Sequence, residues 1–336
     1  MVTIGDVAKA AGVSRSTVSY ALSGKRPISP EVRDKIDSVI RSLNFTPNAG
    51  ARALATSQTH VIALLAQFYA DEFAPAMMQY ILGVTDRARD LGYDTLLVTE
   101  PDGVAALRRI SNSRMVDGFV LLNVAEHDSR LDVLRKAGQP GALVGLPGDP
   151  RGLDVFDLDF EATGALMVDH LHSLGHREII LVSQPEHVVE RGGAYVWRLA
   201  DAARARGDEL GIRLHAHHSA SSQPEVGSDL ANLLETYPDA TGLLLNNEAA
   251  AAALPSVLSA RSLRVPADLS VIGRYSDDFA RTFSLPYSSV DSAAAELGRR
   301  AVEQLVAHIQ GEADAHVVDL TPPKILDRGS TAAPPA

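Results

Sequence analysis

The chain has 336 residues, no cysteine and a formal net charge of −11 at pH 7. Its length is enough for two or three domains with ordinary cores, and the lack of cysteine excludes disulfide bonds, thiolate metal sites and a thiol nucleophile. No apolar run approaches the roughly 18 residues of a membrane span, and the N-terminus lacks a signal-peptide pattern, so we expect a soluble cytoplasmic protein.

Residues 2–22, VTIGDVAKAAGVSRSTVSYAL, predict two short helices joined by a tight turn. Thr3 and Asp6 suit a capping box, Gly12 ends the first helix, and Ser14 caps the second. Apolar residues recur at helical spacing and face inward (Ile4, Val7, Ala8, Ala11, Val18, Ala21 and Leu22). The second helix presents polar side chains that can hydrogen-bond to bases or phosphates (Arg15, Ser16, Ser19 and Tyr20). A helical hairpin with an ordinary polar surface would show the same pattern.

The distribution of charge favours DNA binding over that alternative. Residues 1–60 hold eight Lys and Arg against four Asp and Glu, a net charge of +4, so residues 61–336 carry −15. Contact with phosphates dominates non-specific affinity for nucleic acid, and a basic head on an acidic body is expected when only the head touches a polyanion.

Ser29-Pro30-Glu31 predicts the start of a third helix, with a cap, a proline in the first turn and an acid at the positive end of the helix dipole. Pro47 fixes the exit, so residues 1–46 form a compact helical head. Residues 47–55 are rich in small side chains and could form a short helix, which Gly50 weakens by roughly 1 kcal/mol relative to alanine. Residues 47–60 are thus expected to be a hinge and linker.

From Val61 onward, short apolar runs alternate with amphipathic segments. The runs predict strands at 61–66, 93–99, 117–122, 142–146, 154–158, 178–183, 241–245 and 269–272. Helices are predicted at 74–91, 164–174 and 194–206, the last ending at Gly207. This alternation predicts an α/β fold with doubly wound parallel sheets, and so many strands over roughly 270 residues favour two Rossmann-like lobes. The small, proline-containing tail at 332–336 is expected to be disordered.

An enzyme or a small-ligand-binding protein on a two-lobed fold is the alternative from another class. The chain contains no G-x-G-x-x-G after a strand, no P-loop, no H-E-x-x-H and no G-x-S-x-G. The polar run of His215, His217 and His218 is expected at the surface rather than in a metal site. We therefore expect no catalytic residue, no metal and no cofactor.

The head motifs TIGDVAKAAGVSRSTVSYALSG, ISPEVRDKI and LNFTPNAGARALA resemble the LacI/GalR family of bacterial transcriptional regulators. VDGFVLL, LGHREIILVS, LRVPADLSVIG, ELGRRAVEQL and DRGST extend the resemblance to residues 2–331. It implies a lambda-repressor-like helix-turn-helix head on a two-lobed, periplasmic-binding-protein-like effector domain. It also implies a homodimer that binds a near-palindromic double-stranded DNA operator and is modulated by a small, sugar-like effector, most often as a repressor released by ligand.

The resemblance also implies DNA contacts. Arg15, Ser16 and Tyr20 correspond to residues that read bases, although Tyr20 could instead pack against the neighbouring helix. Leu54 corresponds to a leucine that wedges into the minor groove when the hinge helix orders, its alternative being to pack on the core. The full expected set of DNA-contacting residues is Thr3, Ser14, Arg15, Ser16, Thr17, Ser19, Tyr20, Asn48, Ala51 and Leu54.

Within the effector domain the resemblance implies three chain crossings, near 157–160, 288–291 and 318–322. The first lobe then comprises 61–158 with 291–318, and the second comprises 159–290 with 319–331. Expected effector contacts are Phe68, Tyr69, Phe73, Arg191, Asn246 and Tyr275, with Asp157 or Asp159 at the first crossing. Arg191 could instead be a surface arginine.

The chain departs from its sugar-binding relatives at residues 273–276, Gly-Arg-Tyr-Ser, where they have Gly-aromatic-Asp-Asp. Gap-free counting places Tyr275 where they have an acid, and their Asn-Asp pair becomes Asn246-Asn247. The loss of these carboxylates favours an altered effector, or none, over a standard monosaccharide.

Overall fold

The computed structural model describes residues 2–23, 26–45, 58–69 and 73–335. The chain divides into two compact units, Met1–Val61 with Met115–Asp117, and Ile62–Arg114 with Gly118–Ala336. The predicted hinge helix, with Asn48, Ala51 and Leu54, lies outside the described residues. None of the described helices is long and apolar enough to cross a membrane.

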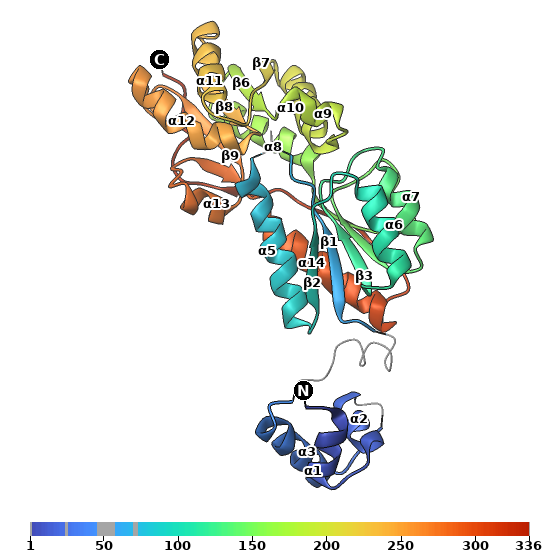
Figure 1. Ribbon diagram of the computed structural model, residues 1–336. Coiled ribbons are helices and arrows are strands. Elements are labelled where there is room, and N and C mark those ends of the chain that lie inside the picture. Colours follow the sequence, from blue (N-terminus) through green and yellow to red (C-terminus); the bar gives the residue numbers. More distant parts are fainter. Residues whose placement is uncertain (1, 24–25, 46–57, 70–72, 336) are drawn as a thin grey trace. The chain divides into compact units, whose positions relative to one another are not determined.

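The head consists of α1 (Ile4–Ala11), α2 (Arg15–Ser23) and α3 (Pro30–Ser42) (Figure 1). Thr3 and Asp6 form the predicted capping box, and Gly12 ends α1 at φ 66°, a left-handed conformation that favours glycine. Ser14 accepts a hydrogen bond from the Thr17 backbone N–H at 3.0 Å. The three helices close on a small apolar core (Val7, Ala8, Ala11, Val18 and Ile36). The predicted helix-turn-helix fold is confirmed.

The second unit contains two six-stranded sheets. The strands of the first are β1 (Val61–Leu65), β2 (Asp94–Val98), β3 (Gly118–Leu121), β4 (Gly141–Val144), β5 (Asp154–Leu158) and β11 (Val318–Thr321), in the order β11-β5-β4-β3-β1-β2. One face packs against α5 (Ala74–Asp90) and α14 (Ala294–Gln310). The connections along the chain add α6 (Gly103–Ser113) and α7 (Ser129–Lys136), which pack against each other.

The second sheet has the order β12-β10-β9-β8-β6-β7 and is parallel except for β12, which runs antiparallel to β10. Its strands are β6 (Glu178–Ser183), β7 (Arg213–His218), β8 (Gly242–Leu245), β9 (Ser270–Arg274), β10 (Ser288–Val290) and β12 (Ile325–Leu326). Its helices are α8 (Phe160–Ser173), α9 (Glu186–Glu190), α10 (Ala194–Leu210), α11 (Glu225–Thr236), α12 (Glu248–Arg261) and α13 (Asp277–Thr282).

Alternation along the strands explains how this sheet buries both faces. Ile179 and Leu181 pack with α8 and α10, whereas Ile180 and Val182, the intervening residues of the same strand, pack with α11 and α12. A period of two turns successive side chains to opposite faces, so a continuous apolar run indicates a sheet covered on both sides. The predicted two-lobed α/β fold with parallel sheets is confirmed.

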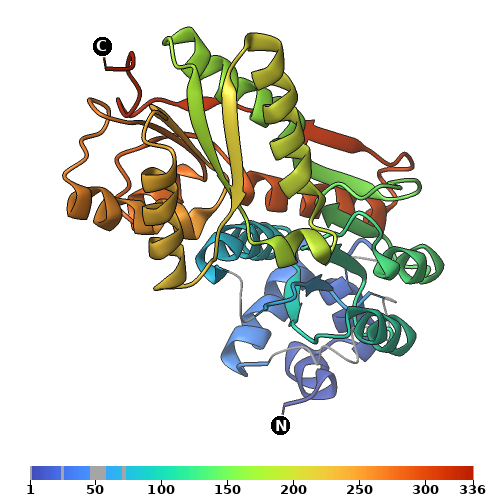
Figure 2. The ribbon, with the colours of Figure 1, turned by 90° about the horizontal axis from the view of Figure 1, so that it is seen from above.

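The chain crosses three times between the lobes, after β5, after β10 and after β11. The third crossing corrects the expected boundary at 318/319, because β11 pairs in parallel with β5 through Thr321 and so belongs to the first sheet. Figure 2 shows this red strand beside the green β5.

The predicted disordered tail at 332–336 is also wrong over its described part. The N–H of Ala332 donates to Ser270 Oγ at 3.0 Å, and the Ala332 carbonyl lies 2.9 Å from His176 Nε2. Ser330, just before the tail, is buried and donates its hydroxyl to the Val271 carbonyl. These bonds hold the chain against β9, and proline composition alone could not reveal them.

Candidate functional site

The exposed side of α2 carries the residues predicted to contact DNA. Arg15 and Ser16 are exposed, while Thr17, Ser19 and Tyr20 are half-buried. The Arg26 guanidinium lies 5.2 Å from the centre of the Tyr20 ring. These positions suit a surface that meets the edges of bases, and the assignment of individual contacts stays a prediction.

Two further predicted DNA contacts have local roles in the head. The Thr3 hydroxyl donates to Asp6 Oδ2 at 2.7 Å, and this hydrogen bond lowers the pKa of the Asp6 carboxyl. The Ser14 and Thr17 hydroxyls lie 2.8 Å apart at the start of α2. Both pairs cap the amino-terminal ends of the first two helices. The Thr3 and Ser14 hydroxyls therefore stabilise the head even without DNA.

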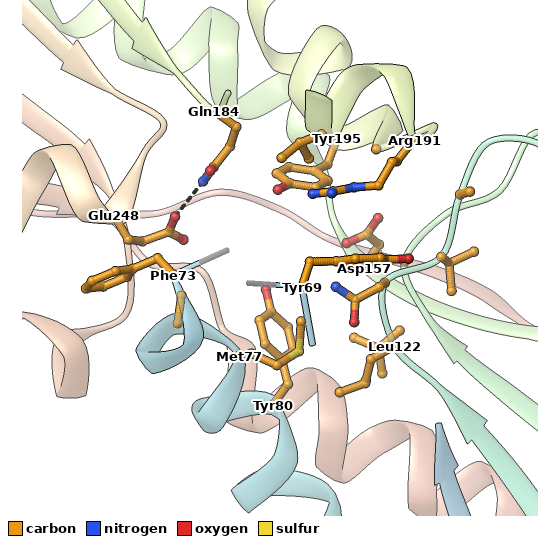
Figure 3. A pocket seen from close by; sticks show the side chains of 18 of the residues that line it. Tyr69, Phe73, Met77, Tyr80, Leu122, Asp157, Gln184, Arg191, Tyr195 and Glu248 are labelled. Carbon is orange, nitrogen blue, oxygen red and sulfur yellow. Dashed lines mark hydrogen bonds between the residues drawn. The ribbon is translucent and has the colours of Figure 1, made fainter. Parts of the chain in front are cut away.

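A pocket lies between the lobes, at the carboxyl ends of the parallel strands, and encloses about 190 Å³ (Figure 3). Its wall is rich in aromatic rings contributed by both lobes (Phe68, Tyr69, Phe73, Tyr80, Phe160 and Tyr195). Crevices at strand carboxyl ends are the usual ligand sites of open α/β sheets.

Four of the six residues predicted to contact an effector line this pocket: Phe68, Tyr69, Phe73 and Arg191. The Arg191 guanidinium lies 4.1 Å from the centre of the Tyr69 ring, a cation–π distance. Of the two carboxyl groups expected near the first crossing, Asp157 lines the pocket, whereas Asp159 caps α8 by accepting from the Ala162 N–H.

The other two predictions, Asn246 and Tyr275, are not among the residues that line the pocket. Tyr275 is buried in the second lobe, where its hydroxyl donates to the Tyr287 carbonyl at 3.0 Å. The physical reason is strand alternation: Arg274 and Tyr275 are consecutive, so if one faces the pocket the other turns into the core. Asn246 is fully buried and accepts from Arg274 Nε at 2.8 Å.

Three pocket residues that sequence reasoning missed form a hydrogen-bonded chain. Arg274 Nη2 donates to Glu248 Oε1 at 2.5 Å, and Gln184 Nε2 donates to Glu248 Oε2 at 2.7 Å, the bond drawn in Figure 3. The available signal was a charged residue that directly follows the apolar run of a buried strand. Gap-free alignment to the family pattern points instead to Tyr275, one position later.

Burial shapes the remaining ionisable groups of the pocket. Desolvation raises the pKa of Asp157 to about 6, although the carboxylate accepts hydrogen bonds from the backbone N–H groups of Leu146 and Leu158. Burial likewise raises the pKa of the Tyr80 phenol. Neutral forms of both groups can donate as well as accept hydrogen bonds.

The lining contains two carboxyl groups, Asp157 and Glu248, and two guanidinium groups, Arg191 and Arg274. Glu248 and Arg274 neutralise each other in a buried ion pair. A site with balanced charge, several hydrogen-bonding groups and aromatic walls suits a neutral ligand that has both hydroxyl groups and an apolar face.

Comparisons with known proteins give concordant results. Residues 3–48 match the description of bacterial regulatory proteins, lacI family, and residues 168–331 match a periplasmic binding protein-like domain. The HTH-type transcriptional regulator MalR of Staphylococcus xylosus is 26% identical over 340 residues, 98% of each chain.

Two solved structures are also similar. A transcriptional regulator CelR–cellobiose complex has a TM-score of 0.66 at 26% identity, covering 98% of this chain and 100% of that one. The lac repressor dimer bound to operator and the anti-inducer ONPF has a TM-score of 0.79 at 24% identity, covering 99% of each chain, and shows likeness of fold.

Proposed function

Because the chain belongs to the lacI family of bacterial regulatory proteins and is a DNA-binding transcriptional regulator, we propose that it represses transcription as a homodimer on a near-palindromic operator. The observation that carries the proposal is the pairing of a basic helix-turn-helix head with a separate core that encloses a ligand pocket. A regulator of transcription acts where the chromosome is, so we expect it in the cytoplasm.

In this proposal each head places α2 in the major groove of one half-site. Arg15, Ser16 and Tyr20 read bases, and hydroxyl groups such as those of Thr17 and Ser19 position the helix on the backbone. The linker residues Asn48, Ala51 and Leu54 contact the minor groove between the half-sites.

The proposed effector is a neutral, hydroxyl-bearing small molecule of the sugar class. The CelR structure contains cellobiose, and the balanced charges and aromatic walls of the present pocket suit a ligand of that general kind. Binding would favour one arrangement of the two lobes, and the resulting coupling to the heads is reciprocal by thermodynamic necessity.

The proposal assigns the pocket to binding rather than catalysis. Glu248 and Arg274 are occupied by each other, and both oxygens of Asp157 accept backbone hydrogen bonds. A general base or nucleophile needs a group that can reach the substrate, and these contacts leave the charged groups in supporting positions.

The decisive experiment is selection of binding sites from random double-stranded DNA with the purified full-length protein. We expect a palindromic consensus, and we expect Tyr20→Ala to change the preferred bases because a base-reading side chain is lost. Ser38→Ala, at an exposed position of α3, is the control and should keep the consensus.

Repeating the selection with a panel of neutral mono- and disaccharides tests the effector, and we expect one of them to release the operator. Enrichment of no palindrome would refute the operator proposal. Equal weakening of all sequences by Tyr20→Ala would remove that residue from base reading, and a consensus insensitive to the whole panel would refute the effector class alone.

A further inference from the structure

A cluster of two histidines and an aspartate lies in the first lobe, away from the pocket. Asp154 is the first residue of β5, His308 belongs to the last turns of α14, and His316 precedes β11. Asp157, which lines the pocket, lies near the opposite, carboxyl end of the same strand. The cluster therefore sits at the amino-terminal edge of the sheet and is separate from the effector site.

The three side chains direct potential ligand atoms at one point. Asp154 Oδ2 lies 2.9 Å from His308 Nε2 and 3.2 Å from His316 Nδ1, and the three ligand atoms lie within 4.8 Å of one another. Tetrahedral zinc with bonds of about 2.0–2.2 Å to nitrogen and oxygen separates its ligand atoms by about 3.3–3.6 Å. Small side-chain movements would thus open the cluster around an ion.

The surroundings orient the carboxylate and leave the cluster accessible. Asp154 Oδ1 accepts a hydrogen bond from the Val317 backbone N–H at 3.0 Å, which turns Oδ2 toward the two imidazoles. The Asp154 side chain is 1% exposed and that of His308 is 10% exposed, whereas that of His316 is 41% exposed. The partly exposed imidazole of His316 gives an ion an entry path to the buried, oriented carboxylate.

We propose that Asp154, His308 and His316 form a binding site for a divalent transition-metal ion, with zinc as the ion that the ligand set suits. Two imidazoles and one carboxylate are typical zinc ligands, and three protein ligands with one open position form a stable coordination set. The bound ion would join the end of α14 to β5 and to the segment entering β11. It would therefore stabilise the first lobe independently of operator and effector.

Sequence spacing could not reveal this site, because 162 residues separate Asp154 from His316 and no short metal-binding motif is present. The same geometry also permits a metal-free cluster in which the two imidazoles donate hydrogen bonds to one carboxylate oxygen of Asp154. The experiment must therefore detect the ion itself rather than the folded cluster.

The test uses untagged full-length protein, freed of metal with EDTA and then titrated with Co²⁺ and, separately, Zn²⁺. Because the chain has no cysteine, thiolates cannot contribute to the cobalt spectrum. We expect one equivalent of Co²⁺ per chain to give visible absorption bands of low-symmetry coordination, and Zn²⁺ to displace it and raise the thermal midpoint of unfolding.

Two single variants, His308→Gln and His316→Gln, should each weaken Co²⁺ binding by more than about tenfold, since loss of a direct ligand costs at least as much as loss of its supporting partner. His316→Gln changes a partly exposed side chain and keeps the fold testable by circular dichroism. His217→Gln, in the histidine-rich strand β7, is the matched control and should bind Co²⁺ as the unmodified protein does.

Stoichiometric Co²⁺ binding that both cluster variants lose and the control retains would support the site. Failure of the unmodified protein to bind one equivalent, or equal binding by all three variants, would overturn it and leave the cluster as a hydrogen-bonded group. Neither result changes the expected outcome of the DNA-selection experiment. The metal site can therefore be refuted without refuting the proposed function.

Discussion

Arg274 and Glu248 form a buried ion pair in the wall of the pocket. Both side chains are more than nine-tenths buried, at 4% and 9% exposure. Removing two charges from water is costly, and their attraction offsets that cost only with good geometry and further hydrogen bonds. Gln184 and Asn246 supply such bonds, one to each partner.

Removing one partner should therefore be far worse than removing both. We expect Glu248→Gln to lower the free energy of unfolding by about 3–5 kcal/mol, because it leaves the Arg274 guanidinium buried without a counter-charge. Combining Arg274→Met with Glu248→Leu should recover much of that loss. Urea denaturation of the single and the double variant measures the difference.

Asp149→Asn provides the matched control for this pair. Asp149 and Arg151 form an exposed ion pair on the surface of the first lobe, where solvent screens the interaction, so this variant should unfold almost as the unmodified protein does. A double variant that is less stable than Glu248→Gln would contradict the buried-charge explanation.

At the residue scale, sequence reasoning found the aromatic part of the pocket and missed its charged part. Phe68, Tyr69 and Phe73 follow a predicted strand, and a segment after a strand points to the carboxyl edge of the sheet. Arg274 and Tyr275 differ by a single step in strand phase. Counting along a chain cannot resolve such a step when the end of the strand is uncertain by one or two residues.

Two helical glycines, Gly164 and Gly207, differ in how closely a neighbouring segment approaches them. Gly164 in α8 lies so close to α10 that a Cβ there would approach the Leu199 carbonyl oxygen to 2.2 Å. Gly207 lies inside α10, where a Cβ would meet its nearest neighbours at 3.6 Å, an ordinary contact. The first glycine permits close packing of two helices, and the second only weakens its helix.

We expect Gly164→Ala to lower the free energy of unfolding by about 1–3 kcal/mol through overpacking of α8 against α10. Gly207→Ala, the control within the same helix pair, should raise it by up to about 1 kcal/mol because alanine favours the helix. Parallel denaturant titrations check both signs. Destabilisation of similar size by both variants would show that helix contact does not explain the difference.

The prediction that the helix beginning at Ala194 stops at Gly207 is wrong, because Gly207 is an interior residue of that helix. Helix α10 continues to Leu210 and ends at Gly211, which adopts φ 68°. A glycine ends a helix only where the chain turns left-handed, and composition does not distinguish that position from an interior one. The strand β7 was missed because its polar histidines hide the alternation of an edge strand.

At the scale of the whole molecule, charge divides between the two parts of the chain. Residues 1–60 carry +4 and residues 61–336 carry −15. Each phosphate that a basic side chain neutralises releases counterions, so the affinity for DNA must fall with salt. The net negative charge of residues 61–336 disfavours contact of the effector domain with phosphates.

Two heads that contact about six to ten phosphates should lose roughly 10³- to 10⁵-fold in affinity between about 50 and 200 mM salt. Combining Lys9→Gln with Lys35→Gln, both in the head, should reduce the slope of log affinity against log salt. Fluorescence anisotropy on labelled duplex DNA measures it. Lys136→Gln, at an exposed position of α7 in the effector domain, is the control and should keep the slope. A head double variant with an unaltered slope would contradict the proposal that the basic residues of the head contact phosphates.

The two lobes followed from the sequence because alternating strands and helices exceeded what one core holds. The exact end of the first lobe did not follow from the sequence, because β11 is short and its outward residues are partly exposed. A strand of four residues at a sheet edge carries little apolar periodicity, so only its pairing with β5 assigns it to the first lobe.

The late return of the chain to the first lobe has a consequence for its synthesis. Strands β1 to β5 are complete by Leu158, yet α14, which covers one face of their sheet, begins only at Ala294. At bacterial rates of about 5–20 residues per second, the ribosome needs several seconds or more to deliver that cover. During that interval only α5, of the two helices that pack on this face, can cover Ile62 and Val120, so nascent chains and products truncated before α14 expose part of the apolar sheet face.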